Sequence, residues 1–488
     1  MLRRTASLMI CCLVFWALGH VVPALAVTLW VPDDHASIQL GIDAASPGDT
    51  VMVSSGRYVE NIDFRGKQIV VKSHDGPLQT VIDGGMISSV VRFRSGEGDQ
   101  SILEGFTLTK GGGVVNGGGI HCSSASPTIL NNWIVWNLAG GGSGGGVCCD
   151  SSSAPTLYGN VIACNTAGGI GGHGQGGGIV SYDSSSPFLH NNLIAWNQAS
   201  QGGGVCLYGS SSCRIENCTF YGNSGSGQES SGGGGLLCGH YSEATVINSI
   251  FWANESPRGP QLHVGSIAYP GSLTISYSDV AGGEAAVFVD TNCVLDWGLG
   301  MFDASPLFAW GNGGQFYLSH AAAGQETDSP CIDAGSDLAS SICAAWAGGS
   351  VCMNGRAVRT DHVCDSDQVD LGHHPAGIAE WQPAGVLEGS QEGRSEQAKL
   401  HRAHPNPGHS SATIRFDVRV PGPVSLQVLD LNGRLVRNLL SSERVRSGAQ
   451  EVVWDGRDDL GHQVESGVYL YRLRTRDSDK SNRIVLFR

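Results

Sequence analysis

Between residues 117 and 254 the chain repeats one pattern of glycine, apolar and polar positions five times. Each repeat opens with a glycine triplet and an aliphatic residue, passes through a serine-rich turn, and ends in a short apolar run that closes on asparagine. The closing asparagines, spaced 28, 32, 26 and 31 residues apart, are Asn137, Asn165, Asn197, Asn223 and Asn254. Short β-rich runs at this period, without helical periodicity, predict one coil of a β-solenoid per repeat.

Equivalent positions of stacked coils form ladders, because neighbouring coils lie about 4.8 Å apart, the spacing of paired strands. One ladder is apolar in every repeat, which favours the interior: Ile134, Ile162, Ile194, Phe220 and Phe251. The neighbouring ladder is mostly apolar too, so the sequence leaves open which of the two faces inward: Trp133, Val161, Leu193, Thr219 and Ile250. A further ladder of asparagine and glycine suits a corner with left-handed backbone, and its amides can hydrogen-bond from coil to coil: Asn131, Gly159, Asn191, Asn217 and Asn248.

These repeats resemble the right-handed parallel β-helix superfamily, which includes pectate lyases and periplasmic copper-insertion proteins. The stretch from Val31 to Gly85 is similar to the N-terminal cap and first coils of bacterial members, with a short capping helix expected at Ile38 to Ala45. Residues 329–337 (SPCIDAGSD) and 359–374 (RTDHVCDSDQVDLGHH) resemble the closing segment of exported members. The expected fold is all-β, with a right-handed parallel β-helix over residues 27–375. A shared fold does not fix a shared function.

The character of the chain changes after residue 375. Residues 376–400 are polar, rich in Gly and Glu and aperiodic, which predicts a linker. Residues 401–488 contain several short strand-like runs, two of them joined by the hairpin signal Asn432-Gly433, and predict a small β-sandwich.

Two motifs in this last segment, LQVLDLNGRLVRNL (residues 426–439) and SGVYLYRLR (residues 466–474), carry a second resemblance. The segment is similar to the C-terminal sorting domain of type IX secretion and to the Ig-like domain of flagellar hook-capping proteins. The resemblance implies that residues 401–488 are recognised by outer-membrane secretion machinery. An accessory Ig-like module without an export role is the alternative.

The N-terminus has the features of a secretory signal peptide. Arg3 and Arg4 precede the apolar run from Leu8 to Leu18, and Ala24-Leu25-Ala26 is an A-x-A cleavage site. The pattern predicts a signal peptide over residues 1–26, cleaved after Ala26. No other apolar stretch is long enough to span a bilayer, so no transmembrane span is expected after cleavage. The expected destination, reached through the periplasm, is secretion or attachment to the outer membrane or cell surface.

The charge distribution excludes nucleic acid as a partner. The chain has a net charge of −15, although residues 401–488 carry 14 Lys and Arg against 10 Asp and Glu. From Gly111 to Glu255 the only Lys or Arg is Arg214. A nucleic-acid surface needs clustered cations, which this part of the chain lacks.

Catalysis has few candidate residues in the coils. A polysaccharide lyase needs a base beside a cation site, and a glycosidase needs two carboxylates a short distance apart. Asp150 and Asp183 occupy similar turns of adjacent repeats and are the nearest to such a pair. They could equally be solvated turn residues.

The closing segment holds the candidate metal ligands, a cluster of carboxylates of the kind that binds calcium: Asp361, Asp365, Asp367 and Asp370. The alternative is a polar cap whose acids hydrogen-bond to turns, because no complete calcium-loop motif is present. Export permits disulfides, which are expected in the same segment with the connectivity left open: Cys331, Cys343, Cys352 and Cys364. Cys122, Cys149 and Cys238 share one repeat position and are expected to pack inside as small apolar groups.

The scarcity of ionisable groups favours a non-enzymatic β-helix that binds glycans or other surfaces at the cell surface. Trp136 and Trp196 occupy one repeat position, where they could stack on sugar rings if exposed or fill the core if buried. A polysaccharide lyase or glycoside hydrolase is the first alternative function. A structural surface protein without a ligand is the second.

Overall fold

The computed structural model describes residues 26–168, 174–227, 232–265, 268–311, 314–346, 349–374, 398–401, 403, 408–409, 411–418, 421–429, 435–464, 467–475 and 479–487. Nearly all of the expected signal peptide (residues 1–25) and of the expected linker lies outside these residues. In the part of the chain that is described, no helix is both long and apolar enough to cross a membrane.

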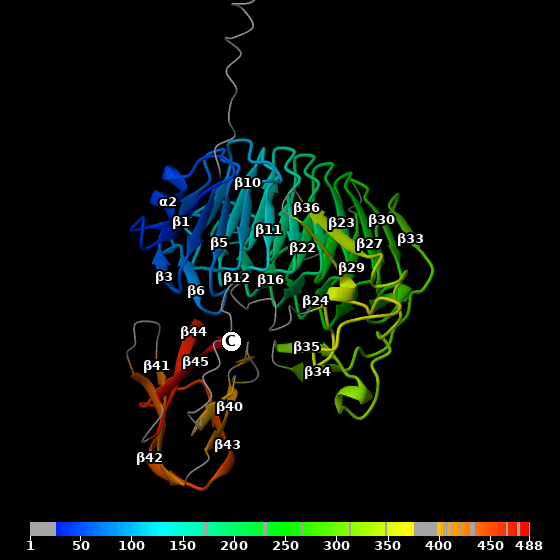
Figure 1. Cartoon of the computed structure of the whole chain (residues 1–488). Coiled ribbons are helices and arrows are strands. Elements are labelled where there is room, and N and C mark those ends of the chain that lie inside the picture. Colours follow the sequence, from blue (N-terminus) through cyan, green and yellow to red (C-terminus); the bar gives the residue numbers. More distant parts are fainter. Residues whose placement is uncertain are drawn as a thin grey trace, which may run out of the picture.

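The first part of the chain is a parallel β-solenoid whose coils stack side by side from β1 to β33 (Figure 1). Sheet A has eleven strands: β1 (Thr28–Val31), β2 (Thr50–Val53), β5 (Val70–Ser73), β8 (Ile102–Glu104), β11 (Thr128–Leu130), β15 (Thr156–Tyr158), β19 (Phe188–His190), β23 (Ser212–Glu216), β27 (Glu243–Ile247), β30 (Ser272–Ser276) and β33 (Val294–Trp297). Sheet B has nine: β3 (Gly56–Val59), β6 (Thr80–Asp83), β9 (Thr107–Thr109), β12 (Trp133–Val135), β16 (Val161–Ala163), β20 (Leu193–Ala195), β24 (Thr219–Tyr221), β28 (Ile250–Trp252) and β31 (Asp279–Val280). Sheet C has nine: β4 (Ile62–Asp63), β7 (Val91–Phe93), β10 (Ile120–Ser123), β14 (Val147–Asp150), β18 (Ile179–Ser181), β22 (Val205–Leu207), β26 (Leu236–Cys238), β29 (Leu262–Val264) and β32 (Phe288–Val289).

A short fourth sheet and the predicted helix complete the coils. The sheet contains β13 (Leu138–Ala139), β17 (Thr166–Ala167), β21 (Gln198–Ala199) and β25 (Ser224–Gly225). Helix α2 (Ile38–Ala44) is capped by the Ser37 side chain, which accepts a hydrogen bond from Leu40 N. Its buried residues Ile38 and Ile42 belong to the same core cluster as the first strands, which confirms the expected capping helix.

The Ile134 ladder is the apolar ladder that faces the interior of the solenoid. Every member of the Ile134 ladder is fully buried, and each belongs to the main core cluster. Ile162 lies between Ile134 and Ile194 in the parallel register. The Trp133 ladder therefore points to the outside of sheet B, because successive side chains of a strand alternate between its two faces. Cys122, Cys149 and Cys238 are buried in the main core, as the sequence predicts.

The closing asparagines form a continuous hydrogen-bonded ladder inside the coils. Asn165 Nδ2 donates to Asn197 Oδ1 at 3.0 Å and to Ile134 O at 2.8 Å. Asn165 Oδ1 in turn accepts from the Nδ2 and backbone N of Asn137. The corner ladder has the expected left-handed backbone, with φ of 53° at Asn131 and 56° at Asn191. Its amides, however, bond mainly to the closing segment, so the amide ladder runs through the closing asparagines instead.

The glycine triplets lie where two parts of one coil approach each other. A Cβ atom at Gly145 would lie 2.5 Å from Thr166 O and 2.6 Å from Gly177 O. Any side chain at this position would collide with backbone, which explains why the triplet recurs in all five repeats.

The chain between β33 and residue 374, here called the closing segment, runs back along the side of the solenoid instead of ending on its last coil. It contains the hairpins β34 (Phe308–Gly311) with β35 (Gly314–Leu318) and β36 (Cys343–Trp346) with β37 (Gly349–Cys352), and the 3-10 turns η2 (Ala321–Ala323) and η3 (Met353–Gly355) follow them in the chain. A further 3-10 turn, η1 (Glu284–Ala286), precedes β32. The asparagine corner holds the segment in place. Asn191 Nδ2 donates to His374 O at 3.0 Å, and Asn217 Nδ2 donates to Asp370 O at 3.1 Å.

The C-terminal strands form a small β-sandwich with its own core. One sheet contains β38 (Ala398–Leu400), β40 (Ala412–Val418) and β43 (Gly448–Trp454). The other contains β39 (Gly408–His409), β41 (Gly422–Leu429), β42 (Leu435–Val445), β44 (Gly467–Arg474) and β45 (Asp479–Phe487). Trp454 and Tyr471 are fully buried between the sheets. Strands β41 and β42 pair antiparallel as expected, while the Asn432-Gly433 turn lies outside the described residues. An immunoglobulin-like topology stays a prediction.

Candidate functional site

The outer face of sheet C brings together three chemically active side chains. His121 on β10 lies directly opposite Cys148 on β14 in the parallel register, and Asp150 follows two residues later on β14. Since side chains alternate along a strand, Cys148 and Asp150 point outward while Cys149 points into the core. The nearest donor atoms of His121, Cys148 and Asp150 lie within 4.8 Å of one another.

Asp150 is the centre of this cluster, because its Oδ2 atom contacts both other side chains. Oδ2 lies 2.7 Å from His121 Nε2 and 3.8 Å from Cys148 Sγ, while Ser151 Oγ donates to Oδ1 at 2.9 Å. Burial alone would raise the pKa of Asp150, but hydrogen bonds from His121, Ser123 and Ser151 outweigh it and lower the pKa to about 2. Asp150 is therefore ionised at neutral pH and is unsuited to act as a general acid.

Cys148 is fully buried, and its Sγ atom also lies 3.6 Å from the Tyr182 hydroxyl. The Asn116 side-chain amide donates a hydrogen bond to that hydroxyl. Burial, and then the neighbouring Cys149, raise the pKa of the Cys148 thiol well above its ordinary value. His121 hydrogen-bonds to Asp150 instead of the sulfur, so the arrangement lacks the base-to-thiol contact that activates a cysteine nucleophile.

The two acids considered for catalysis do not occupy equivalent positions. The register pairs Cys149 with Ser181, which places Asp150 opposite Tyr182 and Asp183 one residue further along. Asp183 is exposed and has a left-handed backbone, with φ of 53°, in the turn that follows β18. This geometry fits the turn-residue alternative for Asp183.

An aromatic ladder crosses the corner between sheets C and A near this cluster. Tyr208, His240 and Tyr269 follow three neighbouring strands of sheet C, and their rings stack with centroids 3.5 Å and 4.6 Å apart. Tyr241 meets Tyr269 edge to face, with ring centroids 5.8 Å apart. Tyr241 is 59% exposed and Tyr269 is 45% exposed, so the ladder presents aromatic surface to solvent.

The backbone of this corner is unfavourable for large side chains. His240 and Tyr241 have φ of 55° and 65°. The preceding coil uses Gly209 and Ser210 at the equivalent turn, where the backbone is also left-handed. Left-handed backbone is costly for bulky residues and is often retained at functional positions. Aromatic rings thus stand where small residues would satisfy the turn, which indicates a role for the rings themselves.

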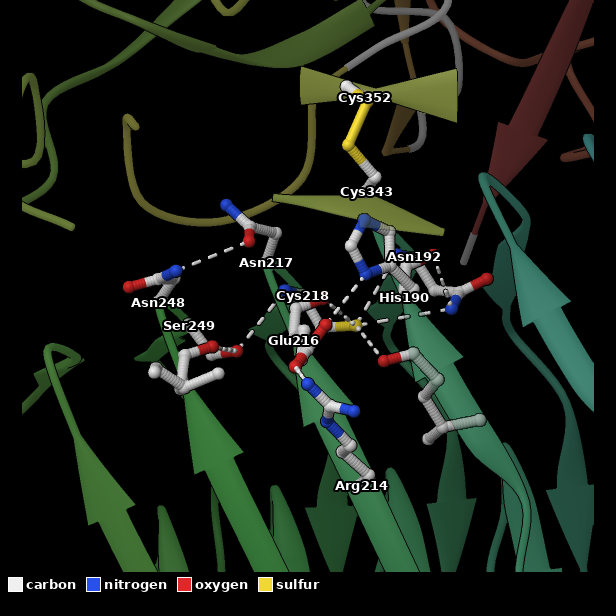
Figure 2. A network of polar contacts seen from close by, with 12 residues as sticks. His190, Asn192, Arg214, Glu216, Asn217, Cys218, Asn248, Ser249, Cys343 and Cys352 are labelled. Carbon is white, nitrogen blue, oxygen red and sulfur yellow. Dashed lines mark hydrogen bonds and ion pairs between the residues drawn. A yellow bond between two sulfur atoms is a disulfide. The ribbon is translucent and has the colours of Figure 1, made fainter. Parts of the chain in front are cut away.

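A second polar network lies on the outer face of sheet A beside the disulfide hairpin β36–β37 (Figure 2). His190 Nδ1 lies 3.0 Å from Glu216 Oε2, and Arg214 forms an ion pair with the same carboxylate. Burial lowers the pKa of His190, whereas the pKa of Glu216, which burial alone would raise, is lowered by His190 and Arg214. The His190 side chain is fully buried, so the network fits docking of the closing segment better than ligand binding.

The structure divides the four acids expected to bind a metal. Asp365 and Asp370 are buried and lie together with His374, whose Nε2 atom is 3.2 Å from Asp365 Oδ2. Asp361 is exposed and binds the Arg359 guanidinium, and Asp367 is exposed next to Ser366. Burial, and then Asp365, raise the pKa of Asp370 to about 7. An imidazole donor is uncommon at calcium, which takes oxygen ligands, so the set of Asp365, Asp370 and His374 suits a transition metal better than the calcium first considered.

The four cysteines of the closing segment have different environments. Cys343 and Cys352 face each other across the β36–β37 hairpin and form a disulfide. Cys331 and Cys364, expected to be bridged as well, are free. Cys331 is buried and its Sγ lies 3.5 Å from Asp279 Oδ2, whereas Cys364 is exposed, so their different positions explain why they do not pair.

Comparison with known proteins identifies two regions of the chain. Residues 172–296 match the family model of the right-handed β-helix region. Residues 402–486 match the model of the secretion system C-terminal sorting domain. The chain thus carries a right-handed β-helix region and a C-terminal secretion-system sorting domain. A sorting domain of this kind implies a secreted or surface-attached protein.

Two solved structures from Porphyromonas gingivalis share short similarities with this sorting-domain protein. One is PorZ, an essential surface component of the type IX secretion system, with 24% identity and a TM-score of 0.14 over 18% of this chain and 11% of that one. The other is dimeric latent PorU, with 19% identity and a TM-score of 0.18 over 26% of this chain and 11% of that one. The search of curated proteins found no match.

Several residues of the candidate sites in the β-helix were not predicted as site residues from the sequence. His121 and Cys148 lie 27 residues apart and become neighbours only when the strand register is known. His374 joins Asp365 and Asp370 because the closing segment folds back on itself. The aromatic ladder had a weak signal, because Tyr208 and the pair His240-Tyr241 interrupt turns that are otherwise rich in serine and glycine.

Proposed function

We propose that this protein is exported by the type IX route and binds neutral glycans at the cell surface through the aromatic ladder Tyr208–His240–Tyr269. The observation that carries the proposal is the exposed surface of Tyr241 and Tyr269 at a corner with unfavourable backbone. Aromatic rings offer a rigid apolar surface with polar edges, which suits the apolar face of a sugar ring. Asp183 and Glu243 are exposed in this region of the chain, and an acidic surface disfavours polyuronates.

The sheet C face supports binding more than hydrolysis. A glycosidase needs one carboxylic acid that is protonated at its working pH. Asp150 has a pKa of about 2, and Asp183 is a solvated turn residue out of register with it. Release of reducing sugar from a polysaccharide panel would instead support the hydrolase alternative.

Truncating the exposed rings is expected to weaken glycan binding. Tyr269→Ala removes a stacking surface, and we expect affinity for a neutral glycan to fall about 10-fold, or ~1.4 kcal/mol. Isothermal titration against glycans selected on an array measures this. Tyr269→Phe keeps the ring and is the matched control, expected to retain binding. Parental affinity in Tyr269→Ala, or failure of the parent to bind any glycan of the panel, would contradict the proposal.

Two features support delivery of the β-helix as a passenger of the sorting domain. The sandwich has a core cluster that shares no residue with the β-helix core, as expected of units that fold separately. At the other end, Val27 N donates to Asp49 Oδ1 at 2.8 Å. Cleavage after Ala26 would convert that amide into an ammonium group beside a carboxylate, a favourable exchange.

Deleting residues 399–488 is expected to leave a folded β-helix in the periplasm, because the deletion removes the sorting domain but not the core of the passenger. Cell fractionation with protease accessibility in a host that has the type IX machinery measures this. Fusion of the same residues to an inert periplasmic protein is the reciprocal control and should carry it to the surface. Normal surface display of the truncated chain would show that the domain is an accessory module.

A further inference from the structure

The cluster of His121, Cys148 and Asp150 holds chemistry that glycan binding does not require. We propose that it is a binding site for a borderline transition-metal cation such as Zn²⁺, independent of the proposed glycan binding. Imidazole nitrogen, thiolate sulfur and carboxylate oxygen are the three protein donor types that Zn²⁺ accepts. Their nearest donor atoms already lie within 4.8 Å of one another, a spacing that a tetrahedral ion can bridge with small side-chain movements.

The strand register gives the site a rigid frame. His121 and Cys148 face each other across a parallel pair, and Asp150 stands on the same face as Cys148 two residues along. All three side chains therefore come from two hydrogen-bonded strands and not from mobile loops. Such a frame lowers the cost of ordering the ligands when the ion binds.

Groups around the cluster orient its carboxylate toward the shared position. Ser151 Oγ donates a hydrogen bond to Asp150 Oδ1. The other carboxylate oxygen, Oδ2, is directed at His121 Nε2 and Cys148 Sγ. Outer hydrogen bonds of this kind fix ligating carboxylates in metal sites. The Tyr182 hydroxyl lies 3.6 Å from Cys148 Sγ. Either this hydroxyl or a water molecule would supply the fourth ligand of a tetrahedral ion.

The donors do not continue along the same row of sheet C. The row reads Arg92, His121, Cys148, Val180 and Cys206 from one strand to the next. Arg92 is engaged by Asp63 and Ser88, while Val180 is apolar and separates Cys206 from the cluster. Cys206 is thus a buried thiol on the same face without histidine or aspartate beside it, which makes it a matched control.

Cobalt substitution tests the site directly in the purified full chain. Co²⁺ bound to a thiolate gives a near-ultraviolet charge-transfer band, which the thiol-free cluster of Asp365, Asp370 and His374 cannot produce. We expect the parent to develop this band to one equivalent of Co²⁺ and to lose it when Zn²⁺ displaces the cobalt. Cys148→Ser should abolish the band, and His121→Gln should weaken Co²⁺ affinity more than 10-fold. Cys206→Ser should titrate like the parent.

The variants are compared only where their metal-free thermal unfolding matches that of Cys206→Ser. His121→Gln serves as the second variant if Cys148→Ser fails to fold, because His121 is partly exposed. The proposal is overturned if the parent gives no thiolate band. It is equally overturned if the band survives Cys148→Ser, if His121→Gln binds Co²⁺ as tightly as the parent, or if Cys206→Ser removes the band.

Discussion

Replacing Ile162 by aspartate is expected to destabilise the β-helix by more than ~4 kcal/mol. Ile162 is fully buried between Ile134 and Ile194, so a carboxylate at this position would face apolar side chains of three coils. A buried charge without a partner costs several kcal/mol, and the lost apolar contacts add to it. Denaturant unfolding followed by circular dichroism, together with resistance to protease, measures the loss.

Two control variants separate the charge from other effects of substitution at this position. Ile162→Val removes one methylene group and should cost only about 0.5–1.5 kcal/mol. Asp183→Asn changes an exposed turn residue and should stay within ~0.5 kcal/mol of the parent. A parental unfolding midpoint for Ile162→Asp would show that this ladder does not line the interior.

The architecture could be predicted from the sequence because each repeat places the same residue types at the same positions of a coil. A strand of one coil needs the same alternation as the strand above it, so the Ile134 ladder remains apolar at each turn. The corner residues Asn131 and Asn191 could be placed in left-handed backbone because asparagine tolerates it. What the sequence could not resolve was the use of a corner amide such as that of Asn191, which donates to the backbone oxygen of His374, 183 residues further along the chain.

The candidate sites were harder to predict, because each depends on contacts between coils or between distant segments. Asp150 was recognised, but its partner His121 lies 29 residues earlier and is set by the strand register. Four acids of the closing segment were grouped by proximity in sequence. The fold separates them, because Asp365 and Asp370 are buried whereas Asp361 is exposed and binds the Arg359 guanidinium. Spacing along the chain is informative within one strand and loses its meaning where the backbone reverses direction.

The internal asparagine ladder gives the second large effect, because one side chain there completes the hydrogen bonds of two other coils. Asn165→Ala removes the acceptor of Asn137 N and Nδ2 and the donor to Ile134 O and Asn197 Oδ1. Each buried polar group left without a partner costs about 1–3 kcal/mol, so a total loss of ~3–5 kcal/mol is expected after partial relaxation. Chemical denaturation of the purified chain gives this difference.

The neighbouring residue provides a control for the asparagine ladder. Gln198 is exposed on β21, directly after the ladder residue Asn197, and Gln198→Ala should change stability by less than ~0.5 kcal/mol. Since Asn165 is linked to the coils on both sides, its loss should also expose amides of those coils, which hydrogen exchange would detect as faster exchange at Asn137. If Asn165→Ala is as stable as Gln198→Ala, the ladder amides contribute no more than the solvent bonds they replace, and the glycine and apolar positions alone hold the coils together.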